Sequence, residues 1–494
     1  MARTPESGRR PRHRRHPRYR LFAAVAAAAL VNLATPGWPA LAALPSGARP
    51  PGVPPPVDMT LLPNPNDEAL IGPRPYDASI TGGPNARHQV DGPSPGNRSC
   101  VTKEQAGAPT VEDIPPGQSR MRLPELRKFG RGARQLIAVI DTGVNQHPRL
   151  AGRLVDGGDY VTGQKPFEDC DGHGTIVAGI IAASDDPKTG FTGVAPDARI
   201  MSVRQSSQVL QVKVQNEGSQ QQTDQPSGDT TTMARAIVHA VNLGATVINI
   251  SEAACVPVSR TVNGHAPDLQ AAVHYAATKN VVVVAAAGNV GQNCPQNAND
   301  LGSVVSPAWF DDDVLTVAAI DSTTSQAADF SLHGPWVDVA APGTEITSLD
   351  PASDQLANKT IQNNQLGSIV GTSFATPYVA GLAALIRERY PSLNAYQVMA
   401  RIEKTTQQAA GKNGRNNAIG HGVVDPIAAL TAVIPEEHGS KPPPVAAAKL
   451  DNLIPPPQKD PTPAKVALIG SAAALALLAL TALITFTATT PRRP

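Results

Sequence analysis

One stretch of the sequence combines a glycine-led turn with the start of an apolar helix: Gly371-Thr372-Ser373-Phe374-Ala375-Thr376-Pro377-Tyr378-Val379-Ala380-Gly381. Residues 382–386 are too apolar to face water, so we expect this helix to be buried. Ser373 would then lie at a rigid helix N-terminus, where the helix dipole favours negative charge and packing fixes the rotamer of a nucleophile. Taken alone, the same pattern is that of an ordinary helix N-cap. The catalytic interpretation therefore depends on residues elsewhere in the chain.

A candidate base and an acid to orient it lie upstream, in residues 171–179 and 136–144. The second segment is an apolar run that ends in Asp141, which is typical of a buried parallel strand, and functional groups collect at the carboxyl edge of such strands. The first segment places His173 between glycines at the start of a small-residue helix. A lone histidine in a capping turn would be structural. The order Asp, His, Ser, each in a glycine-rich turn beside an apolar element, favours catalysis.

Three motifs, Asp141-Thr142-Gly143, His173-Gly174-Thr175 and Gly371-Thr372-Ser373, resemble the active-site motifs of the subtilisin-like serine proteases, in that family's order. The resemblance covers roughly residues 130–430. It implies that Ser373 is the nucleophile, that His173 is the general base and that Asp141 orients the imidazole. The chain also has an arginine-rich start followed by an apolar run at 21–31, a proline-rich extension, four cysteines, and an apolar segment near the C-terminus that is followed by Arg492 and Arg493. In this combination it is similar to the mycosins, the subtilases of actinobacterial type VII secretion systems.

Strands and helices alternate from residue 136 onward, which predicts an α/β fold with a doubly wound, mostly parallel sheet and helices on both faces. We expect the peptidase domain to span residues 126–433. The alternation stops at residues 205–232, which are rich in Gln, Ser, Asp and Gly and are predicted to be an exposed surface loop insertion. The expected strands are 136–141, 198–203, 246–251 and 281–286, and the expected helices follow His173 and cover 233–241 and 269–279.

The strand at 281–286 runs into Ala287-Gly288-Asn289, which brings an amide to the same edge as Asp141. Acyl transfer passes through an oxyanion that fixed donors must stabilise. The resemblance implies that Asn289 is the oxyanion-hole residue, whereas without the triad it would be an ordinary turn residue. The resemblance also implies that substrate lies along Ser251-Glu252-Ala253, and Gly288 is a further expected substrate-binding residue. Subtilisins usually carry a glycine near residues 252–253, so their broad apolar preference is not expected here.

Four cysteines in an exported chain predict disulfides, and four cysteines allow three pairings. Cys255 and Cys294 follow two strands that end at the same sheet edge, so we expect them to be paired. Cys100 would then pair with Cys170 and pin the N-terminal extension just before His173, and the mycosin resemblance supports both bonds. Metal binding is the alternative, but the spacing of the cysteines and histidines is not that of a zinc site. We therefore expect no metal at the site and no cofactor; many subtilisins bind calcium, but no cluster of acids in this sequence requires it.

Residues 1–42 have the pattern of a secretory signal peptide: an arginine-rich start, an apolar run at 21–31 and a small-residue cleavage site at Ala40-Leu41-Ala42. An uncleaved membrane helix is the alternative. Cleavage would remove eight arginines and one glutamate, and would change the net charge from +1 to about −6. The mature chain would then lack the basic surface that nucleic-acid binding requires.

Residues 43–125 form a proline-rich extension with no sustained period, which would not fold in isolation. Such a segment is either a propeptide that is later removed or an extension that wraps the catalytic domain. Folding-assistant propeptides are small folded domains, so we favour the wrapping extension.

The C-terminal part has the sequence pattern of a membrane anchor. Residues 434–465 are a proline-rich linker, residues 466–488 are predicted to be a transmembrane helix, and 489–494 form a short tail containing Arg492 and Arg493. The positive-inside rule places this tail in the cytoplasm and the catalytic domain outside. The sequence patterns thus predict a single-pass cell-membrane serine endopeptidase that acts on exported proteins or peptides, and the mycosin resemblance implies that it works beside type VII secretion components. The alternative is a mainly structural component of that complex, with proteolysis secondary.

Overall fold

The computed structural model describes residues 53–66, 87–90 and 112–438, except for 164, 216–221, 262–264, 292–293, 298–300, 363–364, 410 and 412–413. The chain divides into two compact units, residues 1–434 and 435–494, and the second is described only at the short helix η6 Pro435–His438. No helix within these described ranges is long and apolar enough to cross a membrane. The predicted signal peptide, Cys100, most of the linker, the predicted span at 466–488 and the tail lie outside the described residues.

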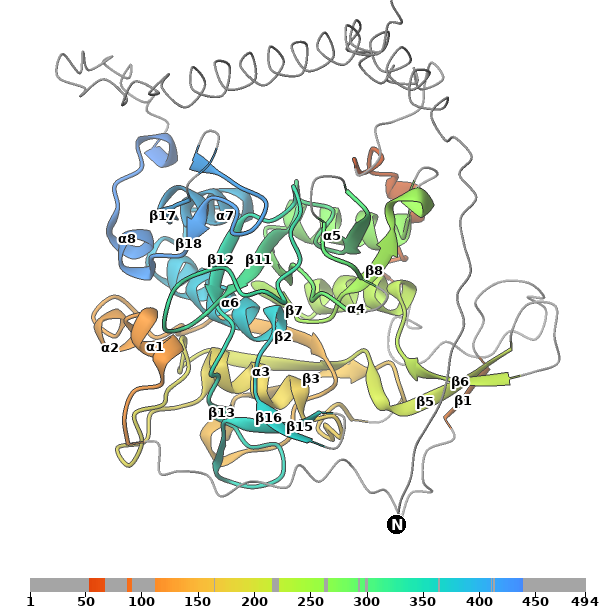
Figure 1. Cartoon of the computed structure of the whole chain (residues 1–494), viewed down its shortest axis with the longest axis horizontal. Coiled ribbons are helices and arrows are strands. Elements are labelled where there is room, and N and C mark those ends of the chain that lie inside the picture. The colour runs from red at the N-terminus through yellow and green to blue at the C-terminus, as the bar shows by residue number, and fades with distance from the viewer. Residues whose placement is uncertain are drawn as a thin grey trace, which may run out of the picture. The chain divides into compact units, whose positions relative to one another are not determined.

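A nine-stranded sheet forms the centre of the first unit, in the order β17-β18-β12-β11-β9-β7-β2-β4-β3 (Figure 1). Every pair is parallel except β17 with β18. The chain places β3 and β4 on one side of β2 and then β7, β9 and the later strands on the other side. Ligands of open α/β sheets bind at the point where the chain changes sides in this way. The strands are β2 Leu136–Asp141, β3 Leu154–Asp159, β4 Arg199–Arg204, β7 Val247–Ile250, β9 Val282–Ala286, β11 Leu315–Ile320, β12 Val339–Pro342, β17 Gln407–Gln408 and β18 Gly422–Val423.

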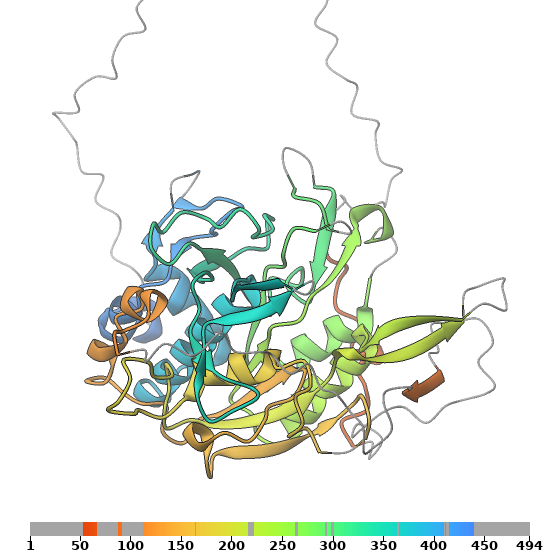
Figure 2. The same cartoon turned by 60° about the horizontal axis from the view of Figure 1, so that its bottom comes forward.

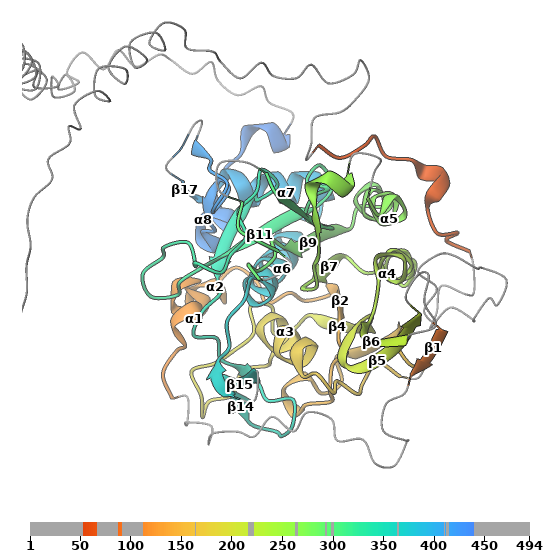
Figure 3. The same cartoon turned by 45° about the vertical axis from the view of Figure 1, so that its right-hand side comes forward.

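Helices cover both faces of the sheet, as predicted, with strands β2, β7 and β9 between them (Figure 3). Successive residues of β2 pack on opposite faces of the sheet: Ile137 and Val139 belong to one hydrophobic cluster, and Ala138 and Ile140 belong to the other. Because successive side chains of a strand point to opposite faces, a fully apolar run is needed to fill both layers. One layer holds α3 His173–Ala182, α6 Thr372–Arg389, α7 Ala395–Lys404 and α8 Pro426–Thr431, and the other holds α4 Thr230–Asn242 and α5 Pro267–Thr278.

The insertion at residues 205–232 is a β-hairpin that projects from the domain, not the irregular loop that we expected (Figure 2). Strand β5 Ser207–Gln215 pairs antiparallel with β6 Gln222–Ser227, and β1 Arg87–Val90 pairs with the other edge of β5. The backbone of a long segment needs hydrogen-bond partners, and a hairpin supplies them. The period-two alternation of Leu210, Val212 and Val214 was the signal for this strand in a polar background.

The folded domain begins earlier than residue 126. Helices α1 Pro116–Arg120 and α2 Leu123–Leu126 already belong to it, because Leu123 and Leu126 are fully buried. Gln118 exchanges two hydrogen bonds with the backbone of Thr192, donating to its carbonyl and accepting from its N–H. These contacts join residues that are 74 apart in sequence, which periodicity cannot reveal.

The described part of the N-terminal extension lies against the catalytic domain. Gln270 of α5 donates a hydrogen bond to the carbonyl of Pro55, and Asn242 of α4 donates one to the carbonyl of Pro65. Leu62 packs on the hydrophobic cluster beneath these helices. Residues 53–66 therefore follow the surface of the domain, as a wrapping extension would.

Candidate active site

Asp141 and His173 meet at the carboxyl edge of the sheet, where β2 ends and α3 begins. The Nδ1 of His173 lies 2.7 Å from the Oδ1 of Asp141. Because a carboxylate accepts, Nδ1 carries the proton, and Nε2 keeps the lone pair that a general base needs. Gly174 allows the two segments to approach, since a Cβ there would lie 2.1 Å from the carbonyl oxygen of Gly143.

A buried hydrogen-bond network around Asp169 fixes this corner. Asp169 accepts hydrogen bonds from the N–H of Gly172, from the hydroxyl of Thr142 and from both the N–H and the hydroxyl of Thr175. The Thr142 hydroxyl in turn accepts the N–H of Gly174. Burial raises the pKa of Asp169 even though these hydrogen bonds oppose the shift. The network joins the end of β2 to the turn before α3 and to the first turn of that helix, and nothing in the sequence beyond the motifs themselves indicated it.

Ser373 lies in the first turn of α6, an 18-residue helix whose first fifteen residues are all buried. Its backbone carbonyl accepts a hydrogen bond of 2.7 Å from the hydroxyl of Ser251. The neighbouring Phe374 ring contacts the ring of His173, with 4.9 Å between centroids. Ser373 and His173 both line one cleft of about 590 Å³. The three candidate catalytic residues thus meet in one place although Asp141 and Ser373 are more than 230 positions apart in sequence.

Asn289 lies beside the first turn of α6. Its Oδ1 accepts hydrogen bonds from the N–H and the hydroxyl of Thr372, both at 3.1 Å. This contact turns the Nδ2 donor away from the helix, and Asn289 lines the cleft. The first N–H groups of a helix have no intrahelical acceptor. Here the Thr372 N–H donates to Asn289 Oδ1, and the Phe374 N–H donates to the Gly371 carbonyl. The Ser373 N–H is therefore left as a second donor beside the Asn289 amide.

The residues predicted to contact substrate all line this cleft: Ser251, Glu252, Ala253 and Gly288. The root of the hairpin contributes two that sequence reasoning missed, Gln208 and Val209. Their backbone N–H groups donate hydrogen bonds to the Oδ1 of Asp171, two residues before His173. The insertion therefore forms part of the cleft wall. Burial and the nearby Asp141 carboxylate raise the pKa of Glu252 to about 7.

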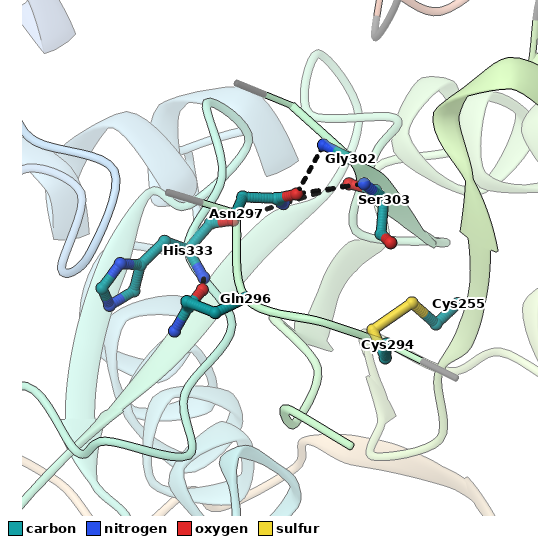
Figure 4. The surroundings of a disulfide bond; sticks show 7 residues. All are labelled: Cys255, Cys294, Gln296, Asn297, Gly302, Ser303 and His333. Carbon is teal, nitrogen blue, oxygen red and sulfur yellow. Dashed lines mark hydrogen bonds between the residues drawn. A yellow bond between two sulfur atoms is a disulfide. The ribbon is translucent and has the colours of Figure 1, made fainter. Parts of the chain in front are cut away.

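A disulfide joins Cys255 to Cys294, the pair expected from the strand ends (Figure 4). It links β8 Ala254–Pro257 to the loop that follows Asn289, and β8 pairs with β10 Ser303–Ser306. Asn297 holds the same loop, because its side chain bonds both the N–H and the carbonyl of Ser303 (Figure 4). Both cysteines line the cleft, so this bond fixes one of its walls. The predicted pairing of Cys170 involves Cys100, which lies outside the described residues.

Comparison with known proteins places this geometry in a family. The Subtilase family, Peptidase_S8, matches residues 132–422. The chain is 40% identical over 403 residues to Mycosin-1 of Mycolicibacterium smegmatis, covering 78% of this chain and 88% of the relative, and 41% identical to Mycosin-3 of Mycobacterium tuberculosis, covering 79% and 89%.

Solved structures give the same result. The structure of the serine protease MycP1, described as an essential component of the type VII (ESX-1) secretion system, matches with 39% identity and a TM-score of 0.64 over 76% of this chain and 99% of that one. A chain of an intact ESX-5 inner membrane complex matches with 36% identity and a TM-score of 0.65 over 88% and 100%. Mycosins are among the relatives that this chain resembles, and the chain belongs to the subtilase family of serine endopeptidases.

Proposed function

We propose that this chain is a membrane-anchored, extracytoplasmic serine endopeptidase in which Ser373, His173 and Asp141 form the catalytic triad. The observation that carries the proposal is the 2.7 Å contact between His173 Nδ1 and Asp141 Oδ1 in the cleft that Ser373 lines. Asp141 is completely buried, whereas the His173 side chain is 24% exposed. Asp141 thus orients the ring from its buried side, and the exposed side of the ring faces the cleft where substrate would bind.

The chemistry follows from these positions. Ser373 Oγ attacks the scissile carbonyl carbon, His173 Nε2 takes the hydroxyl proton, and the carbonyl electron pair moves to oxygen. The Nδ2 of Asn289 and the N–H of Ser373 stabilise that oxyanion. Collapse expels the amine, which takes the proton from the imidazolium. Water then hydrolyses the acyl-enzyme by the same steps, with His173 again acting as the base.

Substrate would lie extended along residues 251–253, in the cleft that Gly288 and Asn289 also line. Glu252 places an acidic group in this cleft, so we expect the substrate preference to differ from the broad apolar preference of subtilisins. Protein substrates are expected to be unfolded locally at the cleavage site, because the cleft lies between fixed walls of backbone and a disulfide.

The location of the enzyme is inferred from the sequence together with its relatives. The signal-peptide pattern at 1–42 and the apolar segment at 466–488 predict export and anchoring. The similarity to a chain of the ESX-5 inner membrane complex supports an association with type VII secretion components. An anchored enzyme would meet substrates that emerge nearby at high effective concentration.

The same similarity favours a second function, a structural role in a secretion complex with proteolysis secondary. Two variants, assayed side by side for secretion and substrate cleavage in cells, separate the two functions. One is anchored Ser373→Ala protein, and the other is an active protein that ends near Lys459. Restored export by the inactive anchored form favours the structural role, and lost export favours obligatory proteolysis. Full export with the unanchored form would show that the anchor is needed neither for the proteolytic role nor for the structural role, which contradicts both proposals.

A further inference from the structure

Glu252 lies next to the two residues that prepare the nucleophile. One carboxylate oxygen of Glu252, one of Asp141 and one ring nitrogen of His173 all lie within 4.8 Å of one another. The triad mechanism described above does not use this third group. Its position nevertheless brings a second carboxyl close to the ring that exchanges protons.

The backbone holds Glu252 in this place. Strand β7 pairs in register with β2, and Ile250 is the partner of Ile140, so residue 252 follows just beyond the level of Asp141. Ser251 is tied on both sides, because its hydroxyl accepts a hydrogen bond from the Asn249 amide at 2.9 Å and donates one to the Ser373 carbonyl at 2.7 Å. Glu252 is therefore fixed relative to the nucleophile.

Among the described residues, the charges that act most strongly on Glu252 are those of Asp141 at the end of β2, His173 at the start of α3 and Asp171 in the turn before it. The Oδ1 of Asp141 accepts the His173 and Thr142 N–H groups, whereas its buried Oδ2 has no hydrogen-bond partner among the described residues. Burial and the Asp141 charge raise the pKa of Glu252 to about 7, and His173 opposes this shift. Glu252 thus changes charge in the pH range in which histidine does.

We propose that Glu252 is a positioning residue for peptide hydrolysis: its carboxyl is a third ionisable member of the Asp141–His173 pair, and its charge sets the pH at which His173 becomes a base. This inference rests on the proposed triad. When ionised, Glu252 adds negative charge beside the ring and favours the imidazolium. That charge stabilises the transition state, in which the ring holds the serine proton, and it also moves the acid limb of the rate to higher pH.

Glu252→Gln keeps the size of the side chain and removes its charge, so two effects should appear together. The acid limb of the kcat/KM profile should move to lower pH by about half a unit to one unit, because charges at this distance interact by roughly that amount in a partly wet site. The pH range of this limb should also become narrower, because a single group then titrates in place of two coupled groups. The plateau at high pH should fall by about three- to tenfold, because the imidazolium loses a favourable charge. A purely structural role would lower the plateau without moving the limb.

The test measures kcat/KM of the detergent-solubilised full chain on a fluorogenic peptide from pH 5 to 9. Glu345→Gln is the matched control, since it removes an exposed carboxylate that does not line the cleft. We expect the control to keep the parent profile and Glu252→Gln to show the shifted limb with the lower plateau. A Glu252→Gln profile whose midpoint and steepness equal those of the parent would overturn the inference.

A second measurement does not depend on turnover. In the Ser373→Ala protein, the imidazole of His173 can be titrated by NMR with and without Glu252→Gln. The inference requires the midpoint to fall in the double variant, and an unchanged midpoint would refute it even if the Glu252→Gln enzyme is too slow to assay. Failure of the proposed triad would look different, because the Ser373→Ala protein would then still cleave the peptide.

Discussion

Asn289 makes an observed contact at the start of α6 and has a proposed role as an oxyanion donor, and substitution can separate the two. Its Oδ1 accepts the Thr372 N–H at the start of α6, and its Nδ2 is the expected oxyanion donor. Asn289→Ala removes both. Asn289→Asp keeps an oxygen acceptor for Thr372 and places an oxygen where the donor was.

The magnitudes follow from these contacts. Loss of one preorganised oxyanion donor costs about 10²–10³-fold in kcat, equivalent to about 2.7–4 kcal/mol. KM should change little, because the donor acts on charge that develops only in the transition state. Loss of the helix-start acceptor should cost about 1 kcal/mol of folding stability in Asn289→Ala, and little in Asn289→Asp.

The assay combines steady-state kinetics on a fluorogenic peptide with denaturant unfolding of the same preparations. We expect kcat to fall at least 100-fold in both variants, with reduced stability only in Asn289→Ala. A kcat for Asn289→Asp within tenfold of the parent would refute the assignment of Nδ2 as the donor. Equal stability of all three proteins would instead refute the role of Oδ1 at the helix start.

Three further outcomes are expected. Replacing Cys255 and Cys294 with alanine opens a loop closed over 39 positions, which should cost about 4 kcal/mol of stability in the chain-entropy estimate and raise KM, measured by unfolding and kinetics. Burial raises the pKa of Asp338 well above its usual value, so the contribution of this carboxyl to folding stability falls as the pH rises above about 4. Asp338→Asn should therefore match the parent in stability near pH 4 and be the more stable protein at pH 8. A difference in stability that is the same at both pH values would contradict this. Ser251→Ala removes the hydrogen bond to the Ser373 carbonyl and should cost about 1 kcal/mol of stability with a modest loss of kcat, whereas an unchanged kcat and unfolding midpoint would show that this contact is not needed.

The sheet, and the meeting of Asp141 with His173 in the cleft that Ser373 lines, could be predicted because their signals are local. An apolar run that ends in an acid marks both β2 and its functional end, and glycines around His173 and Ser373 mark turns where backbone approaches closely. The pairing of Cys255 with Cys294 followed from the same strand ends. Each of these inferences needed only the rule that parallel strands finish at one edge.

The remaining features depend on contacts between distant residues. Asp169 lies in a short polar turn that resembles a solvated loop, yet it is buried and holds the corner of the site. The exchange between Gln118 and Thr192 brings α1 into the domain without any apolar period to announce it. In the hairpin, abundant glutamines hid a short alternation of apolar residues. Periodicity reports which side of an element is buried, but it does not identify the partner.

Covalent labelling tests the central claim most directly, because a fluorophosphonate reacts only with a serine that is activated by its neighbours. Mass spectrometry of the labelled full chain should show one adduct, on the peptide that contains Ser373, and loss of peptidase activity in proportion to labelling. His173→Ala protein should not be labelled at a comparable rate. An adduct on another residue, or full peptidase activity in Ser373→Ala protein, would contradict the account.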